Sequence, residues 1–228
     1  MFIEDFLGQH TPSTPIELSN EASNTLISPI TATEVQKIID SLGIKTARGP
    51  NNIPNLLLKS TAKFFINLIT NTFNSVFLGD EKFPDEFKIS KIVLIPKKSS
   101  PSNIRNWRPI SIGNSIYKIY TKLIGRRLAS ALPTLLGLEQ KAYTSKSNIS
   151  EATCNIIESL AFLNSHARRP VNGNNMLVAI DWKKAFDSLN HDFIAKALHY
   201  FKFPTAFINA INKWLSCRKS TIIVDGNP

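Results

Sequence analysis

Apolar residues recur every three or four positions in several stretches of this chain, which is the spacing of one face of an α-helix. The pattern predicts helices near residues 31–42, 64–77, 116–128, 149–163, 190–201 and 205–216. Thr31 and Glu34 stand three apart at the start of the first stretch, so they predict a capping box there. Gly43 follows that stretch and is predicted to take the left-handed conformation that often ends a helix.

The second predicted helix carries a one-sided stripe that is rich in aromatic residues. Such a stripe is typical of core packing rather than of a cofactor site, so we expect this face to be buried. Its members are Phe64, Phe65, Leu68, Ile69, Thr72, Phe73, Val76 and Phe77.

Shorter apolar runs predict a few β-strands between the helices. The residues at the start of the chain, 1–29, are rich in Ser, Thr, Asn and Pro and predict an irregular lead-in. Helices dominate, so the predicted fold class is α+β. The predicted strands are residues 89–95, closed by Pro96 and followed by a hairpin-like loop at 99–106, then residues 176–182 and residues 221–224.

Positive charge is concentrated in one part of the chain. The 228 residues include 27 Lys and Arg against 17 Asp and Glu, a net charge of +10. Residues 87–138 contain ten cations and no acid, which equals the whole excess. Ten cations without an acid need an anion to offset their repulsion, which indicates nucleic acid first and acidic lipid second. The ten are Lys88, Lys91, Lys97, Lys98, Arg105, Arg108, Lys118, Lys122, Arg126 and Arg127.

Composition also bears on location. Cys154 and Cys217 make neither a disulfide framework nor a zinc site, which favours a reducing, intracellular compartment such as nucleus or cytoplasm. The first eight residues lack the basic start of a signal peptide, so secretion is not expected. No apolar run approaches the roughly 20 residues of a membrane span, and we expect no membrane partner.

An acid stands at the end of the predicted strand 176–182. Residues 177–180 are apolar, and Asp181 follows them directly. A carboxylate at the carboxyl end of a buried strand points into the crevice where α/β-type sheets bind ligands. It suits Mg²⁺, which takes one or two carboxylates and completes its shell with water and phosphate oxygens. The simpler interpretation is a strand-end Asp that only caps the next turn. The residues after Asp181 must therefore distinguish a metal-binding Asp from a capping one.

Those residues resemble motif A of the reverse transcriptases of non-LTR (LINE-type) retrotransposons. The family pattern is Asp, three variable residues, Ala-Phe-Asp, a variable pair and a polar-His step. This chain reads Asp181-Trp182-Lys183-Lys184-Ala185-Phe186-Asp187-Ser188-Leu189-Asn190-His191. Four motifs in order, over residues 29–226, are far more specific than one. The other three are Gly49-Pro50 with Ile53-Pro54, similar to the family's GPDGIP region; Leu94-Ile95-Pro96-Lys97 with Asn106-Trp107-Arg108-Pro109-Ile110-Ser111, similar to its fingers motif; and Gln140-Lys141-Ala142-Tyr143.

The resemblance implies an RNA-directed DNA polymerase acting on an RNA template, a DNA primer and deoxynucleotide triphosphates, with Mg²⁺ or Mn²⁺ as cofactor. Asp181 would bind both metal ions, and the main-chain carbonyl of Trp182 would help to hold the nucleotide's metal. Lys97 and Arg108 would grip the triphosphate. Phe186 would lie against the sugar and exclude a 2′-hydroxyl.

The resemblance also implies template contacts and a division of the chain. Residues 30–175 would form the fingers with the start of the palm, and residues 176–228 a partial palm. Lys118, Lys122 and Arg126 are four apart, opposite the apolar face of their helix, so they are expected to share one face. The residues expected at nucleic acid are Lys98, Arg105, Lys118, Lys122, Arg126, Arg127, Gln140 and Lys146.

The chain departs from the family pattern in three places. Ser145-Lys146 replace Gly-Arg, which keeps a cation but loses the planar fork. Asn51-Asn52 replace Asp-Gly in a turn. Family members carry an Asp-Asp pair on a hairpin after motif A, and no Asp-Asp dipeptide occurs in these 228 residues. We therefore expect a right-hand polymerase fold truncated before the catalytic hairpin, inactive alone, with self-association through an exposed palm edge.

Two alternatives remain open from the sequence. A non-catalytic remnant of a retroelement would keep the basic face and bind nucleic acid without chemistry. A Mg²⁺-dependent phosphatase would use Asp181 as its nucleophile, but Asp181-Trp182-Lys183 lacks the Asp-x-Asp signature, and the basic run would have no role.

Overall fold

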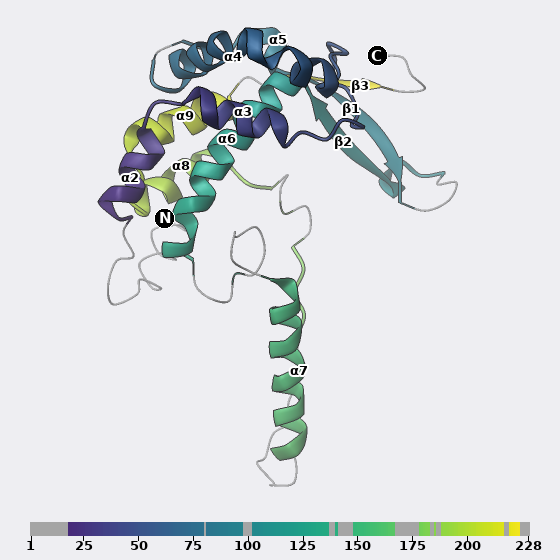
Figure 1. The fold of residues 1–228 in the computed structure, drawn as a ribbon. Coiled ribbons are helices and arrows are strands. Elements are labelled where there is room, and N and C mark those ends of the chain that lie inside the picture. Colours follow the sequence, from purple (N-terminus) through teal and green to yellow (C-terminus); the bar gives the residue numbers. More distant parts are fainter. Residues whose placement is uncertain are drawn as a thin grey trace.

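The structure is a computed structural model, and it describes residues 18–79, 81–97, 102–136, 140, 148–166, 178–182, 185, 188–216 and 219–223. The elements combine helices with one small sheet, in agreement with the predicted α+β class (Figure 1). In chain order they are α2 (Asn20–Ile27), α3 (Ala32–Asp40), α4 (Asn55–Phe77), α5 (Asp85–Lys88), β1 (Ile89–Pro96), η1 (Ile104–Asn106), β2 (Trp107–Gly113), α6 (Ser115–Ala131), η2 (Leu132–Thr134), α7 (Ile149–His166), α8 (His191–Tyr200), α9 (Thr205–Leu215) and β3 (Lys219–Ile223).

A helical body surrounds α6. This helix packs against α2 and α3, while α4 packs against α3 and α9 (Figure 1). The core extends from Leu18 to Ile211, so it includes residues on both sides of the boundary predicted at 175/176. Helix α2 lies within the stretch that was predicted to be irregular, which corrects that prediction. The helix forms because Ser19 caps its start by accepting from Ala22 N–H and because Leu26 is fully buried in the core.

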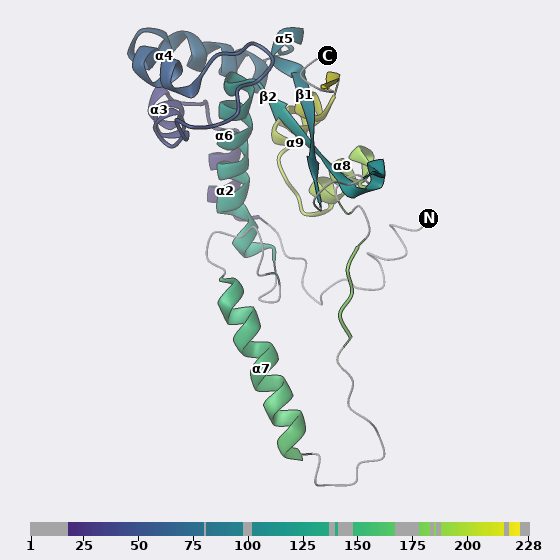
Figure 2. The same cartoon turned by 90° about the vertical axis from the view of Figure 1, so that its right-hand side faces the viewer.

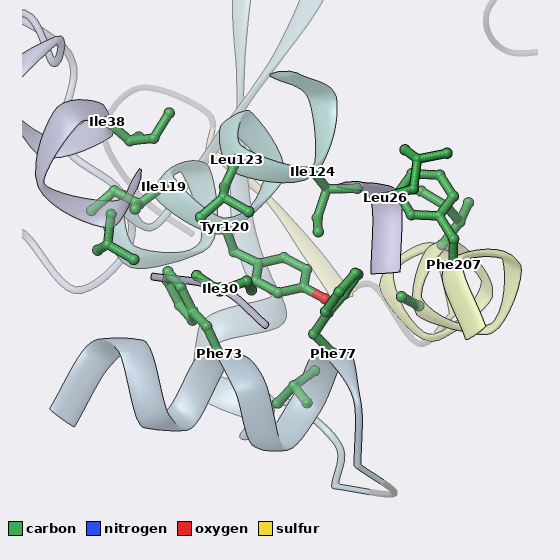
Figure 3. Close-up of a cluster of buried hydrophobic side chains, with 14 of the residues drawn as sticks. Leu26, Ile30, Ile38, Phe73, Phe77, Ile119, Tyr120, Leu123, Ile124 and Phe207 are labelled. Carbon is green, nitrogen blue, oxygen red and sulfur yellow. The ribbon is translucent and has the colours of Figure 1, made fainter. Parts of the chain in front are cut away.

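Aromatic rings fill the centre of this body. Tyr120 of α6 stands edge-on to Phe73, with ring centroids 5.2 Å apart, and to Phe83, with centroids 4.6 Å apart. Figure 3 shows its hydroxyl reaching toward Phe77, among apolar side chains. The hydroxyl has no hydrogen-bond partner in the part of the chain that the structure describes. Burial raises the pKa of this phenol; Tyr117 adds to the effect and Arg127 opposes it.

The strands within the described residues form one three-stranded sheet in the order β2–β1–β3. β1 and β2 form an antiparallel hairpin, with Ile95 opposite Arg108. The first strand and the hairpin-like loop were predicted, whereas β2 was not. β3 adds parallel to β1, with Ile92 opposite Ile222. Three serine hydroxyls cross this sheet on one face: Ser111 Oγ lies 3.0 Å from Ser90 Oγ, which lies 2.8 Å from Ser220 Oγ.

The predicted capping box is confirmed, because Thr31 and Glu34 form it at the start of α3. At the start of α8, Asn190 is the N-cap and accepts from Asp192 N–H. Gly43 does not take the predicted left-handed conformation. The reason is that α3 already ends at Asp40, where the Ser41 N–H bonds back to carbonyls of the last turn. Asn52, in the position where the family has Gly, takes a φ of 55°, which Asn tolerates better than most residues.

The aromatic stripe of α4 is only partly buried, which corrects the prediction. Phe73, Val76 and Phe77 lie in the core, but Phe64 and Phe65 are 71% and 50% exposed. Helices α3 and α9 and Tyr120 of α6 cover only part of the apolar arc of α4, so the rest of that arc faces outward.

A buried polar network ties the loop before α4 to the start of α6. Asn114 Oδ1 accepts from Asn51 N–H at 3.1 Å, and its Nδ2 donates to the Glu86 carbonyl at 2.7 Å. Ser115 Oγ donates to Asn55 Oδ1 at 2.7 Å. Gly49 packs so closely here that a Cβ atom would lie 2.7 Å from Asn114 Cα. The loop is therefore held against the sheet–helix junction.

Two segments stand apart from the body. Helix α7, predicted correctly from its spacing, projects away from the rest in both views (Figures 1 and 2). Residues 178–182 form no strand, although a strand was predicted at 176–182. A strand needs a partner for its backbone groups, and the described sheet contains only β2, β1 and β3. No helix in the described residues is long and apolar enough to cross a membrane.

Candidate nucleic-acid interface and catalytic carboxylate

A row of cations runs along one face of α6. Ile119, Tyr120 and Leu123 are buried on the opposite face, which fixes the helix's orientation. Lys118, Lys122 and Arg126 are spaced four apart, so successive charges are about 6 Å apart along the axis. Lys122 and Arg126 are exposed and Lys118 is half-buried. The arrangement is that of a phosphate-binding row.

Lys118 occupies the end of this row, next to the loop before α4. Its Nζ lies 3.5 Å from the Ala47 carbonyl oxygen. Burial lowers the pKa of the Lys118 ammonium, and the nearby positive charge of Lys91 on β1 lowers it further. The protein therefore holds this charge at a cost in free energy that a bound anion would offset.

Lys122 and Lys59 flank the C-terminal end of α3. Lys122 Nζ lies 3.4 Å from Ser41 Oγ, and Lys59 Nζ of α4 donates to the Asp40 carbonyl at 2.8 Å. Cations are favourable at a helix C-terminus, and each ammonium keeps two further donors. No local pattern in the sequence indicates Lys59, because its position beside Lys122 depends on a contact between distant segments.

Arg127 has a different role from the predicted nucleic-acid contact. Its side chain is 5% exposed, and its guanidinium forms a two-pronged pair with the Glu34 carboxylate at 3.1 and 3.0 Å. It also donates to the carbonyls of Ser28 and Pro29 and stacks over the Phe77 ring, 5.4 Å from its centroid. These contacts tie α6 to the α2–α3 connection, so Arg127 is a structural residue.

The residues predicted to grip a triphosphate lie on the β1–β2 hairpin. Arg108 is exposed on β2, and Lys97 follows the last residue of β1, so both cations lie at the same end of the hairpin. Lys97 Nζ donates to the Arg105 carbonyl at 2.9 Å, which secures the connection between the strands. Arg105 is itself exposed on η1.

Asp181 lies in the extended segment 178–182 and is exposed. It makes no hydrogen bond or ion pair with the other described residues, and among these residues no group of three His, Cys, Asp or Glu side chains could hold a metal ion. The segment lies apart from the β1–β2 hairpin in both views (Figures 1 and 2). The structure thus does not bring Asp181 together with Lys97 and Arg108.

The apolar residues around Asp181 are exposed too. Val178, Ile180 and Trp182 are 60%, 80% and 79% exposed. They alternate along the segment, as the apolar side of a strand would. Among the other predicted site residues, Gln140 is exposed, whereas Lys98, Lys146 and Phe186 lie outside the described residues.

Comparison with known proteins agrees with the family that the sequence motifs resemble. Residues 95–227, more than half of the chain, match the family described as "Reverse transcriptase (RNA-dependent DNA polymerase)". The chain is 25% identical over 214 residues to the "Probable RNA-directed DNA polymerase from transposon BS" of Drosophila melanogaster, which covers 92% of this chain and 22% of that protein.

Two further relatives come from other mobile elements. The chain is 29% identical over 141 residues to the "Retrovirus-related Pol polyprotein from type-1 retrotransposable element R2" of Popillia japonica, covering 62% of this chain and 19% of that protein. It is 31% identical over 103 residues to the "RNA-directed DNA polymerase from mobile element jockey" of Drosophila melanogaster, covering 45% and 11%. The chain thus spans about a fifth or less of these relatives. The predicted resemblance is confirmed: the chain belongs to the reverse transcriptase family, with relatives in non-LTR retrotransposons.

Proposed function

We propose that this chain supplies the fingers and part of the palm of a right-hand RNA-directed DNA polymerase. The observation that carries the proposal is the family match over residues 95–227, which includes the motif around Asp181. The cation row on α6 supports it, because a polymerase must hold the phosphates of its template and primer. The polymerase would extend a DNA primer on an RNA template with deoxynucleotide triphosphates.

Asp181 would be the metal-binding carboxylate of this polymerase, with the Trp182 main-chain carbonyl beside it. Oxygen donors of this kind fit Mg²⁺ or Mn²⁺, and the exposure of Asp181 leaves room for water and phosphate oxygens in the metal's shell. The metal, when bound, neutralises charge on the attacking and leaving oxygens. One carboxylate is an incomplete set for two ions, so further ligands must come from outside the described residues.

Lys97 and Arg108 would hold the triphosphate from the hairpin, and Phe186 would lie against the sugar. For both cations to act with Asp181, the segment 178–182 and the hairpin must approach each other. If the segment paired with a further strand, its apolar side chains Val178, Ile180 and Trp182 could pack on another part of the polymerase and become buried. The same apolar side is the basis for expecting self-association of the isolated chain.

Primer extension on an RNA template tests the proposal. The 228-residue chain is expected to bind primer–template but not extend it, because these residues contain no Asp-Asp pair. A longer version that includes the region following motif A in the relatives is expected to extend the primer, and Asp181→Ala is expected to reduce its extension to background. Extension that survives Asp181→Ala in the longer version would contradict the role of Asp181. Binding without extension in every version would favour a non-catalytic nucleic-acid-binding remnant.

Lys118→Met tests the phosphate-binding row. The substitution removes one phosphate contact, so the slope of log affinity against log salt should fall by about one, for RNA and DNA of any sequence. Because Lys118 carries its charge at a cost, the free energy of unfolding should not fall. The measurement is RNA affinity over a salt series, with Lys196→Met on α8, an exposed lysine outside the row, as the matched control. An unchanged slope for Lys118→Met would remove this residue from the interface.

A further inference from the structure

The outer face of α4 is apolar, and no other element of the described residues covers it. Leu57, Phe64 and Leu68 are spaced seven and four apart, so they share one side of the helix. Their exposures are 49%, 71% and 64%, whereas Phe73 on the opposite side is fully buried. A contiguous exposed apolar patch of this kind marks a binding surface.

The charge on this helix is of one sign. Residues 55–77 include Lys59 and Lys63 and no Asp or Glu. Lys63 Nζ lies 4.8 Å from the centroid of the Phe64 ring, so a cation already rests on the exposed aromatic. An aromatic ring beside cations is the combination that binds single-stranded nucleic acid, in which bases stack while phosphates are neutralised.

This face continues from the cation row on α6. Lys122 of that row and Lys59 of α4 lie at the same end of α3, against Ser41 and Asp40. Lys63 follows Lys59 by one turn and leads to Phe64. The Asp40 side chain is the acid on this route, and its carboxylate accepts from Gln36 at 2.8 Å. A phosphate backbone leaving the α6 row would therefore meet Lys59, Lys63 and then an exposed ring.

We propose that the outer face of α4 binds a single-stranded stretch of nucleic acid, with a base stacked on Phe64 and a phosphate at Lys63, the backbone reaching this face past Lys59 at the side of the helix. The inference rests on the proposed function for the class of ligand, and it adds a site outside the polymerase motifs. A second copy of the chain fits this face less well. A two-fold pairing through this face would bring the two Lys63 side chains together with no acid on either copy of α4 to pair them.

Phe65 provides a matched control on the same helix. It is aromatic and 50% exposed, but it lies about 100° further around the axis, away from Lys63. If RNA binding depended only on exposed apolar area, alanine at Phe64 and alanine at Phe65 would weaken it equally. If a base stacks on the ring beside Lys63, only alanine at Phe64 would weaken it.

The experiment measures affinity of the 228-residue chain for a single-stranded RNA and for a duplex RNA of equal length. Phe64→Ala is expected to weaken single-strand binding at least about fivefold, with duplex binding unchanged, and Phe64→Tyr should restore it. Phe65→Ala should stay within about twofold of the unchanged protein. Thermal melting confirms that the variants are folded.

Three outcomes would overturn the inference. One is an unchanged single-strand affinity in Phe64→Ala, and another is an equal loss in Phe64→Ala and Phe65→Ala. The third is that sedimentation shows a changed oligomeric state for Phe64→Ala while its RNA affinity stays the same. That result would assign the face to a protein partner. The salt slope of Lys118→Met reports on the α6 row separately, so failure at α4 is distinguishable from failure of the proposed function.

Discussion

Arg127→Ala is expected to lower the free energy of unfolding by about 3 kcal/mol, the lower end of the range for breaking a buried ion pair. The Arg127 side chain is 5% exposed, and its removal takes away the donor of the Ser28 and Pro29 carbonyls. It also removes the cation paired with the Glu34 carboxylate, which keeps only its capping-box bonds from Thr31. Glu34 is itself 36% exposed, so water can compensate in part, which is why the lower end applies. Urea unfolding gives the measurement.

Arg126→Ala is the matched control for this prediction. Arg126 is the preceding residue on the same helix, but it is exposed. Its loss should change the free energy of unfolding by less than about 0.5 kcal/mol and should weaken RNA binding instead. Arg127→Lys should not restore stability, because an ammonium cannot reproduce the two-pronged pair. Equal stability of the two alanine variants would contradict the structural role of Arg127.

This pair of arginines shows what the sequence can and cannot predict. Both belong to a run of ten cations without an acid, from which a basic surface was predicted. Which of two adjacent arginines faces outward depends on Glu34, 93 residues away. Local signals such as the Thr31–Glu34 capping box were predicted correctly because both partners lie within one helical turn.

Two other errors have the same physical origin. The apolar pattern of α4 predicted one buried face, but the pattern does not reveal how much of that face the neighbouring helices cover, and Phe64 and Phe65 remain exposed. The apolar run before Asp181 predicted a strand, but strand formation requires a partner for its backbone groups. In the described residues, β3 adds to β1 and residues 178–182 join no sheet. The geometry around Asp181 therefore stays a prediction of the motif.

Gly49→Ala is expected to destabilise the protein by about 1–3 kcal/mol, as overpacking does in a well-packed interior. Gly49 is buried, and a Cβ there would lie 2.5 Å from Asn114 Oδ1 and 2.7 Å from the Gly113 carbonyl oxygen. Two of its three close neighbours are backbone atoms of the β2–α6 junction, which cannot rotate away as a side chain does. The substitution should displace the loop and break the Asn51 N–H to Asn114 bond.

Gly125→Ala is the control, because it is expected to change the free energy of unfolding in the opposite direction. Gly125 is exposed in the interior of α6, and a Cβ there would meet nothing within 4 Å. Alanine in this position should raise the free energy of unfolding by about 0.5–1 kcal/mol, because it restricts the unfolded chain and favours the helix. Urea unfolding of both variants tests the contrast. If Gly49→Ala is as stable as the unchanged protein, close packing against Asn114 does not hold the loop. In that case the same contact does not fix the position of the Ala47 carbonyl beside Lys118 either.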